Sequence, residues 1–404
     1  MTAGIPAHRA ARAVVELRSG GQPLAHTEVI VELTRHEFGF GNIGFEIIDH
    51  ANGHGAQGDD ELAKLWLDVF NLATLPFYWG DFEPDEGQPR TERLRRAAEW
   101  FAAHDVRVKG HPLVWHSVAP SWLIGRPSAE VAATVRARIR REVTDFRGLV
   151  DLWDIVNEAV IAPVFDNGDN AITPLAHELG RVGLIRLAVD EARATDPAVV
   201  LHLNDFDLSP AYEALIDEVL DAGIRLDGIG LQTHMHQGYR GEEQVVGITD
   251  RFARFGLPLH FTETTLVSGD LMPSGIVDLN DYVREDWPTT PEGEARQAAE
   301  LERHYRVLFG HPAVASITYW GLADRGAWLG APAGLVRLDG TPKPGYDTLR
   351  RLIRDEWWTP VTTIRTDESG RMPLAGTRGT YRLTAGALET RVELDGSPLV
   401  VELA

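Results

Sequence analysis

The sequence predicts an α/β fold, a closed (β/α)8 barrel of the TIM type, and two observations support this prediction. From about residue 36 to residue 356, short apolar or β-branched runs alternate eight times with amphipathic stretches. Strands that alternate with helices form parallel sheets. Eight such units over roughly 320 residues lie within the usual size of a closed barrel.

Eight runs rich in apolar and β-branched residues are predicted to be the barrel strands. They cover residues 36–44, 69–79, 107–115, 149–158, 199–207, 226–234, 257–265 and 314–324. Helical periodicity appears between them. Two buried helix faces are predicted from residues spaced by three and four, namely Leu94, Ala97, Ala98 and Phe101, and Leu179, Val182, Ile185, Val189 and Ala192.

The two ends of the chain have a different pattern. Residues 12–34 predict two strands joined around Gly20 and Gly21, and residues 362–403 alternate β-type residues with Gly, Asp and Ser turns. We expect these ends to form a small β module built from both terminal segments. The predicted domains are a 1–35 N-terminal β segment, a 36–356 catalytic barrel and a 357–404 C-terminal β segment.

Composition narrows the classes of partner. Of the 404 residues, 39 are Lys or Arg and 60 are Asp or Glu, so the net charge of −21 argues against nucleic acids and anionic membranes as partners. The chain has no cysteine, which excludes disulfides and thiolate metal sites. The first twenty residues lack a continuous apolar run, so we expect a cytoplasmic location, or secretion if a leader was removed. The oligomeric state stays open.

Polar, titratable and aromatic residues gather where the predicted strands end. In barrels of this kind the carboxyl ends of the strands face the active site. Asn157 and Glu158 end the fourth strand, and Glu263 ends the seventh. The candidate site residues are Tyr78, Trp79, His111, Trp115, Asn157, Glu158, Asn204, Gln232, His234, Glu263, Trp320 and Trp328.

The composition of this predicted rim indicates glycoside hydrolysis. One carboxyl group must protonate the leaving oxygen, while a second carboxylate faces the anomeric carbon. Glu158 and Glu263 are placed nearly opposite each other in the predicted barrel and can fill these two roles. Indole faces suit the apolar faces of sugar rings, and amides and imidazoles can bind hydroxyl groups.

Seven short motifs in order make the sequence resemble glycoside hydrolase family 10, the retaining endo-β-1,4-xylanase family, over about residues 36 to 350. They are KGHPLVWH (109–116), WDIVNEA (153–159), LNDFD (203–207), DGIGLQTH (227–234), HFTET (260–264), YWGLADRGAW (319–328) and PKPGY (342–346). The resemblance implies an endo-1,4-β-xylanase-like enzyme that binds an oligo- or polysaccharide and requires neither a cofactor nor a metal ion.

The resemblance also implies roles for individual residues. Glu158 matches the acid/base, and Glu263 matches the nucleophile of a double displacement. Asn157 matches the residue that binds the sugar 2-hydroxyl group, Gln232 contacts the acid/base region, and His234 hydrogen-bonds the nucleophile. His111, Trp115, Trp320 and Trp328 match positions that contact sugar. The mechanism requires a raised pKa for Glu158 and a lowered one for Glu263.

The sequence departs from the family pattern where the second sugar on the non-reducing side is bound. The segment 74–84 keeps Trp79, but Tyr78 occupies the position of a lysine and the family's Glu-Asn pair is absent. Thr265 replaces an aspartate that in the family backs the histidine near the nucleophile. The exchanges in segment 74–84 predict an aromatic, less polar wall, and hence a different sugar, linkage or decoration at this subsite.

Three alternatives stay open. The chain can be a family-10-like β-glycosidase that acts on a non-xylan or decorated glycoside. It can also be a barrel that binds carbohydrate without turnover, a reading to which Thr265 lends some support. A metal-dependent hydrolase is the third alternative, because His234 and His236 form an HxH pair at a strand end.

Overall fold

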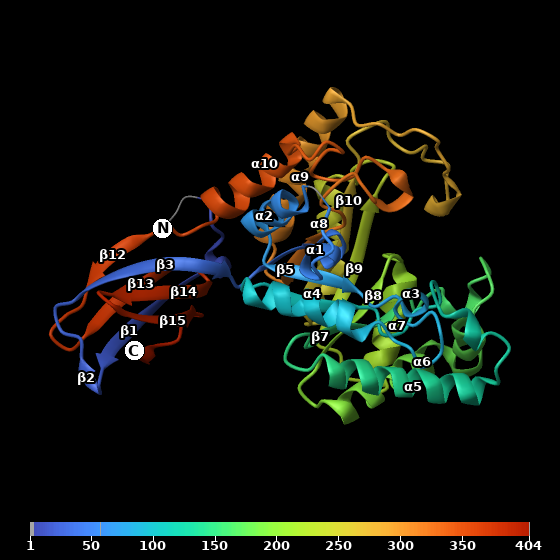
Figure 1. Ribbon diagram of the computed structural model, residues 1–404, viewed down its shortest axis with the longest axis horizontal. Coiled ribbons are helices and arrows are strands. Elements are labelled where there is room, and N and C mark those ends of the chain that lie inside the picture. Colours follow the sequence, from blue (N-terminus) through green and yellow to red (C-terminus); the bar gives the residue numbers. More distant parts are fainter. Residues whose placement is uncertain (1–3, 57, 404) are drawn as a thin grey trace. The chain divides into compact units, whose positions relative to one another are not determined.

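The computed structural model describes residues 4–56 and 58–403, and Figure 1 shows their helices and strands. They form two compact units. One consists of the chain up to Phe40 together with the chain from Asp347 onward, and the other of Gly41–Tyr346. In the described part of the chain, no helix combines the length and apolarity that crossing a membrane requires.

The predicted (β/α)8 barrel is confirmed. Eight parallel strands close in the order β10-β11-β4-β5-β6-β7-β8-β9. The strands are β4 (Gly39–Ile43), β5 (Leu72–Pro76), β6 (Arg107–His111), β7 (Leu152–Asn157), β8 (Val200–Asp205), β9 (Gly228–Met235), β10 (Leu259–Leu266) and β11 (Val314–Tyr319). Nearly every strand residue is buried, as expected for parallel strands that are covered on both faces.

Helices follow the strands and surround them (Figure 1). They are α1 (Ile48–Ala51), α2 (Asp59–Val69), α3 (Trp79–Phe82), α4 (Thr91–Ala103), α5 (Ser128–Asp145), α6 (Ile172–Thr195), α7 (Pro210–Asp221), α8 (Glu242–Ala253), α9 (Pro291–Gly310) and α10 (Pro344–Arg350). The stripe predicted for α4 is buried as expected. In α6 the prediction is wrong at Leu179, which is 38% exposed. Gly180, with φ of 70°, interrupts the helix there and moves Leu179 off the buried face.

Two long loops extend from the carboxyl ends of β10 and β11. The first, residues 267–290, joins β10 to α9, and the second, residues 320–343, joins β11 to α10. They share a small apolar core formed by Val267, Met272, Trp287, Ala331 and Ala333. We call them the first loop and the second loop.

The β module predicted from both chain ends is also confirmed. One sheet has the order β13-β1-β16 with β2 beside β1, and the other has the order β12-β3-β14-β15. The strands are β1 (Ala10–Ser19), β2 (Gln22–Pro23), β3 (Glu28–His36), β12 (Thr362–Arg365), β13 (Arg371–Thr377), β14 (Gly379–Ala385), β15 (Leu388–Leu394) and β16 (Leu399–Glu402). Alternate residues such as Val15, Leu17, Val31 and Leu383 form one shared core.

Candidate active site

Strand ends and local irregularities set the positions of the two glutamates. Asn157 ends β7 and Glu158 follows it, while Glu263 lies within β10. Both strands contain a register shift, between Asp154 and Val156 in β7 and next to Glu263 in β10. Such bulges change the direction of side chains and are common beside active sites.

Glu158 adopts a backbone conformation that is rare for a non-glycine residue, with φ of 56°. Its amide N–H donates to the carbonyl oxygen of Asn204 over 2.8 Å, which holds this conformation against β8. The side chain accepts hydrogen bonds from Trp115 Nε1 at 2.8 Å and from Asn157 Nδ2 at 3.1 Å. Burial raises the pKa of Glu158 to about 8, and the charges of Glu263 and Asp205 add to this effect against the Trp115 bond.

Glu263 has two histidine neighbours and an amide donor. His234 Nε2 lies 3.1 Å from its Oε2, and His111 Nε2 lies 3.7 Å from its Oε1. Asn204 Nδ2 donates to Oε1 over 2.9 Å. Burial alone raises the pKa of Glu263, but His111, His234 and Lys109 outweigh it, so that the pKa falls below its usual value. The predicted pair of opposite pKa shifts is therefore present.

A bridge of amides joins the two carboxyl groups. Asn204 Nδ2 donates to Glu263 and also, over 2.7 Å, to Asn157 Oδ1. Asn157 in turn donates to Glu158, and Gln232 Nε2 reaches both Asn157 Oδ1 at 3.1 Å and Glu158 Oε1 at 3.4 Å. The chain of contacts fixes the acid relative to the nucleophile.

Beneath the rim, His111 is oriented by a buried ion pair that the sequence reasoning missed. Asp154 Oδ2 lies 2.7 Å from both His111 Nδ1 and Lys109 Nζ. Burial opposes ionisation of Asp154, but Lys109 and His111 hold its pKa well below the usual range. Lys109 could have indicated this ion pair from the sequence, because a charge inside a buried strand requires a partner.

Aromatic side chains form a wall on one side of the site. The Tyr78 ring lies 5.4 Å from that of Trp115 and 5.9 Å from that of Phe45, and Phe45 lies 5.7 Å from Trp320. Burial, and then the charges of Glu263 and Glu158, hold the pKa of Tyr78 well above its usual value. Tyr78 is therefore a neutral phenol beside both glutamates. Phe45, which follows the first barrel strand, was not among the predicted site residues.

Three further tryptophans were predicted as site residues. The ring of Trp328, in the second loop, packs against that of His234 at a tilt, with centroids 4.7 Å apart, and Trp320 lies 6.1 Å from the same imidazole. Trp79 was predicted to line the site, and this stays a prediction. Its indole is only 3% exposed, donates to Glu83 over 3.0 Å and packs against Trp122.

The two histidines of the HxH pair have different surroundings. His234 lies between Glu263 and Thr265, whose Oγ1 is 2.8 Å from His234 Nδ1. His236 has the rings of Trp287, Trp328 and His234 as neighbours. Within residues 4–56 and 58–403, no group of three or more His, Cys, Asp or Glu side chains is placed to hold a metal ion.

Curated relatives share modest identity with this chain. Endo-1,4-beta-xylanase B of Thermotoga neapolitana is 28% identical over 316 residues, which are 73% of this chain and 85% of that protein. The anti-sigma-I factor RsgI6 of Acetivibrio thermocellus is 26% identical over 376 residues. This match includes 91% of this chain, which spans less than half of that relative, 43% of its length.

Solved structures share the fold. A GH10 protein from Paenibacillus barcinonensis superimposes with a TM-score of 0.64 at 23% identity, over 80% of this chain and 97% of the other. Xylanase 10B of Thermotoga petrophila, solved with xylobiose, gives 0.64 at 22% identity, over 79% and 94%. Residues 48–351 match the model of glycosyl hydrolase family 10. This chain therefore belongs to glycosyl hydrolase family 10 and is an O-glycosyl hydrolase.

Proposed function

We propose that this enzyme cleaves β-1,4-linked xylan-type chains with retention of configuration, with Glu263 as the nucleophile and Glu158 as the acid/base. One observation carries the assignment of roles: the two bridged glutamates have pKa values shifted in opposite directions, to about 8 for Glu158 and below the usual value for Glu263. The xylan-type substrate is supported by the names of relatives such as endo-1,4-beta-xylanase B.

The reaction proceeds in two displacements. The Glu263 carboxylate attacks the anomeric carbon, the bond to the glycosidic oxygen breaks, and Glu158 gives its proton to that oxygen. Glu158, now a carboxylate, then takes a proton from water, whose oxygen attacks the same carbon and releases Glu263. Esterification removes the charge of Glu263, which had raised the pKa of Glu158, so the same side chain becomes a better base for the second step.

The neighbouring residues act on these two steps. His111, held by Asp154, and His234 stabilise the carboxylate form of Glu263 before attack. The amides of Asn157 and Asn204 lie between the glutamates, at the place where a sugar hydroxyl group beside the reacting carbon would bind. Trp115 donates to one carboxyl oxygen of Glu158 and Asn157 to the other, so the two bonds hold the carboxyl group that gives the proton.

A second candidate substrate is a decorated or non-xylan β-glycoside. It is favoured by the wall of Tyr78, Phe45, Trp115 and Trp320, which presents ring faces and one neutral phenol at the rim. Rates on unsubstituted xylan, aryl β-xyloside, β-glucoside and cellobioside distinguish the two candidates. A rate on plain xylan far above that on all other substrates contradicts the second candidate.

The roles are tested with an aryl β-glycoside whose acidic phenol leaves without protonation. We expect Glu158→Ala to form the glycosyl-enzyme from it but to hydrolyse the intermediate slowly, with a loss of about 10²–10⁴-fold in steady-state turnover. Added azide should restore turnover and give the β-glycosyl azide. With Glu263→Ala, azide should instead give the α-azide, because it replaces the nucleophile.

Glu99→Ala, an exposed position on α4, is the matched control and should keep wild-type rates. Reversed stereochemistry of the two azide products would show that the roles are exchanged. Unchanged turnover in Glu263→Ala would favour a reading in which neither glutamate is catalytic.

A further inference from the structure

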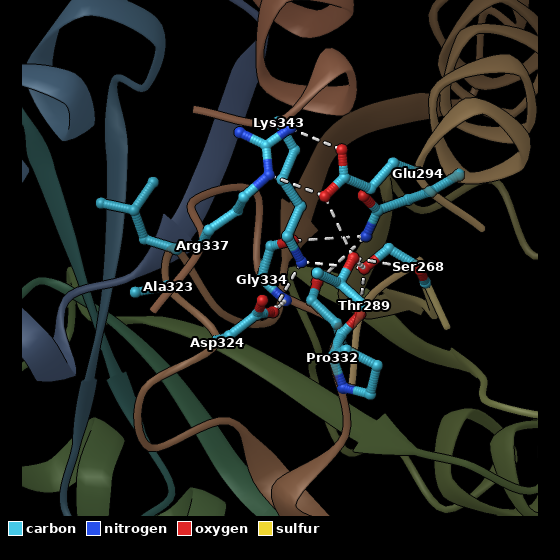
Figure 2. A network of polar contacts seen from close by, with 12 residues as sticks. Ser268, Thr289, Glu294, Ala323, Asp324, Pro332, Gly334, Arg337 and Lys343 are labelled. Carbon is cyan, nitrogen blue, oxygen red and sulfur yellow. Dashed lines mark hydrogen bonds and ion pairs between the residues drawn. The ribbon is translucent and has the colours of Figure 1, made fainter. Parts of the chain in front are cut away.

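One buried polar network joins the bases of the first loop and the second loop (Figure 2). Lys343 Nζ, at the end of the second loop, donates to Asp324 Oδ1 over 2.7 Å and to Ser268 Oγ over 2.8 Å. Asp324 lies near the start of that second loop, and Ser268 lies at the start of the first. The Lys343 side chain has no exposed surface. One ammonium group therefore connects the two loops at their bases.

Additional contacts complete the connection at the end of the first loop. Ser268 Oγ lies 2.8 Å from Thr289 Oγ1, and Thr289 Oγ1 donates to Glu294 Oε1 at 3.2 Å. Arg337 of the second loop pairs with Glu294 through Nε at 2.7 Å. Figure 2 shows these side chains converging from both loops and from the start of α9.

The backbones at these bases approach so closely that side chains are excluded. A Cβ atom on Gly293 would lie 2.2 Å from the carbonyl oxygen of Ser268. A Cβ atom on Gly334 would lie 2.3 Å from the backbone N of Asp324. The loop bases are therefore both hydrogen-bonded and close-packed.

The far parts of the loops carry the tryptophans that cover the histidine pair of β9. Trp328 lies 4.7 Å from His234 and 5.2 Å from His236, and Trp287 lies 6.4 Å from His236. Trp328 is 36% exposed, and the next residue, Leu329, has a strained φ of 62°. A segment with a strained backbone and a partly exposed side chain keeps one position only when its surroundings hold it. The buried network at the loop bases is the rigid part of the second loop.

We propose that Lys343 is a positioning residue that acts through Trp328, because its bonds to Asp324 and Ser268 hold the second loop so that the indole stays on His234. His234 is the partner of the nucleophile, so the network links the loop bases to the sugar-binding face beside Glu263. This inference rests on the proposed function for its effect on catalysis, but the effect on the loop itself does not depend on it.

The test is a double-mutant cycle of Lys343→Met and Trp328→Ala, assayed with the aryl glycoside and oligosaccharide that the wild type cleaves. Each single variant should raise KM for the oligosaccharide by about 10-fold and change kcat by less than about threefold, since substrate positioning is what each removes. Because both act through the same indole, the double variant should be no worse than either single variant. Multiplied effects on KM, or a lower melting temperature without a change in KM, would overturn the proposal.

A second measurement is independent of substrate. Backbone hydrogen exchange of residues 325–331 should be faster in Lys343→Met than in the wild type, while Lys64→Met, which removes an exposed ion pair with Glu61, should leave it unchanged. Unchanged exchange in Lys343→Met would also overturn the proposal. Lys343→Met combined with Asp324→Asn leaves no buried unpaired charge and serves if the single variant does not fold. If the wild type does not cleave these substrates at all, that result would instead contradict the proposed function.

Discussion

At the scale of single residues, burial raises the pKa of both rim glutamates, and the side chains around them decide the difference. Burial raises the pKa of Glu158 to about 8, because its neighbours offer little positive charge to oppose it. Glu263 is also buried, yet two imidazoles and Lys109 lower its pKa. The barrel thus provides an acid and a carboxylate together near neutral pH.

Thr265 contacts the histidine that neighbours Glu263, because its hydroxyl group lies 2.8 Å from His234 Nδ1. A hydroxyl that donates to Nδ1 leaves a ring proton on Nε2, which faces Glu263. Thr265→Val keeps the shape but removes the donor. We expect the pKa of Glu263 to rise and the acidic limb of kcat/KM against pH to move to higher pH, with a loss of about 10-fold at pH 5.

Two further variants at this position supply the controls. Thr265→Ser keeps the hydroxyl group and should restore the wild-type profile. Thr265→Asp provides an acceptor for a second imidazole proton, favours the charged ring and should move the acidic limb to lower pH. An acidic limb that stays in place in both Thr265→Val and Thr265→Asp would contradict this role for Thr265.

Sequence alone predicted most of the site because its residues lie at or near the carboxyl ends of strands, where a polar side chain is conspicuous. Glu158, Glu263 and His234 were all predicted in this way, and the structure brings them together. Phe45 could not be predicted, because one aromatic residue in an apolar segment fits the core equally well.

At the scale of elements, strand positions were predicted well and irregularities were not. The runs of apolar residues mark all eight strands, because parallel barrel strands are buried on both faces. The bulges in β7 and β10 and the break of α6 at Gly180 leave little trace in periodicity. They arise from packing against neighbouring elements, which no single segment encodes.

Two helical glycines give a matched prediction about packing. Gly293 lies in the first turn of α9 against Ser268, whereas Gly247 lies within α8 with no atom within 4 Å of an added Cβ. Gly247→Ala should stabilise the protein by about 0.5–1 kcal/mol, because alanine favours the helix and less backbone entropy is lost. Gly293→Ala should destabilise it by about 2 kcal/mol or more, because the loop base must open.

Chemical denaturation of both variants measures the two free energies of unfolding. Equal effects of the two substitutions would show that the close contact at Gly293 relaxes easily, and would weaken the argument that the loop bases are rigid.

At the scale of the whole molecule, residues distant in sequence complete each unit. In the β module, β1 pairs with β13 and β16, and β3 pairs with β12 and β14, so neither chain end supplies a complete sheet. Sequence predicted this arrangement because both ends contain alternating strands that need a partner. The strand order and the parallel pairing of β1 with β16 required the structure.

The two glutamates should have opposite effects on stability. For Glu158, the folded pKa of about 8 exceeds the ordinary value, so its protonated form is the one that suits the folded state. The contribution of Glu158 to stability is fully present below pH 4.5 and is lost as the pH rises toward 8. Glu158→Gln resembles the protonated acid and avoids this loss. It should therefore be more stable than the wild type at pH 8.5, on the order of 3 kcal/mol, with little difference at pH 4.

Glu263→Gln should show the reverse pattern. Its folded pKa is depressed, so its contribution is present above pH 4.5 and disappears as the pH falls through the folded value. This variant should be less stable than the wild type by about 1 kcal/mol or more at pH 7, and the difference should shrink toward pH 3. Tryptophan fluorescence is a suitable measure, because nine of the eleven tryptophans lie in Gly41–Tyr346 and report on the barrel. Changes of the same sign in both variants at pH 8 would mean that the two sites do not differ in charge preference, and the assignment of acid and nucleophile would lose its physical basis.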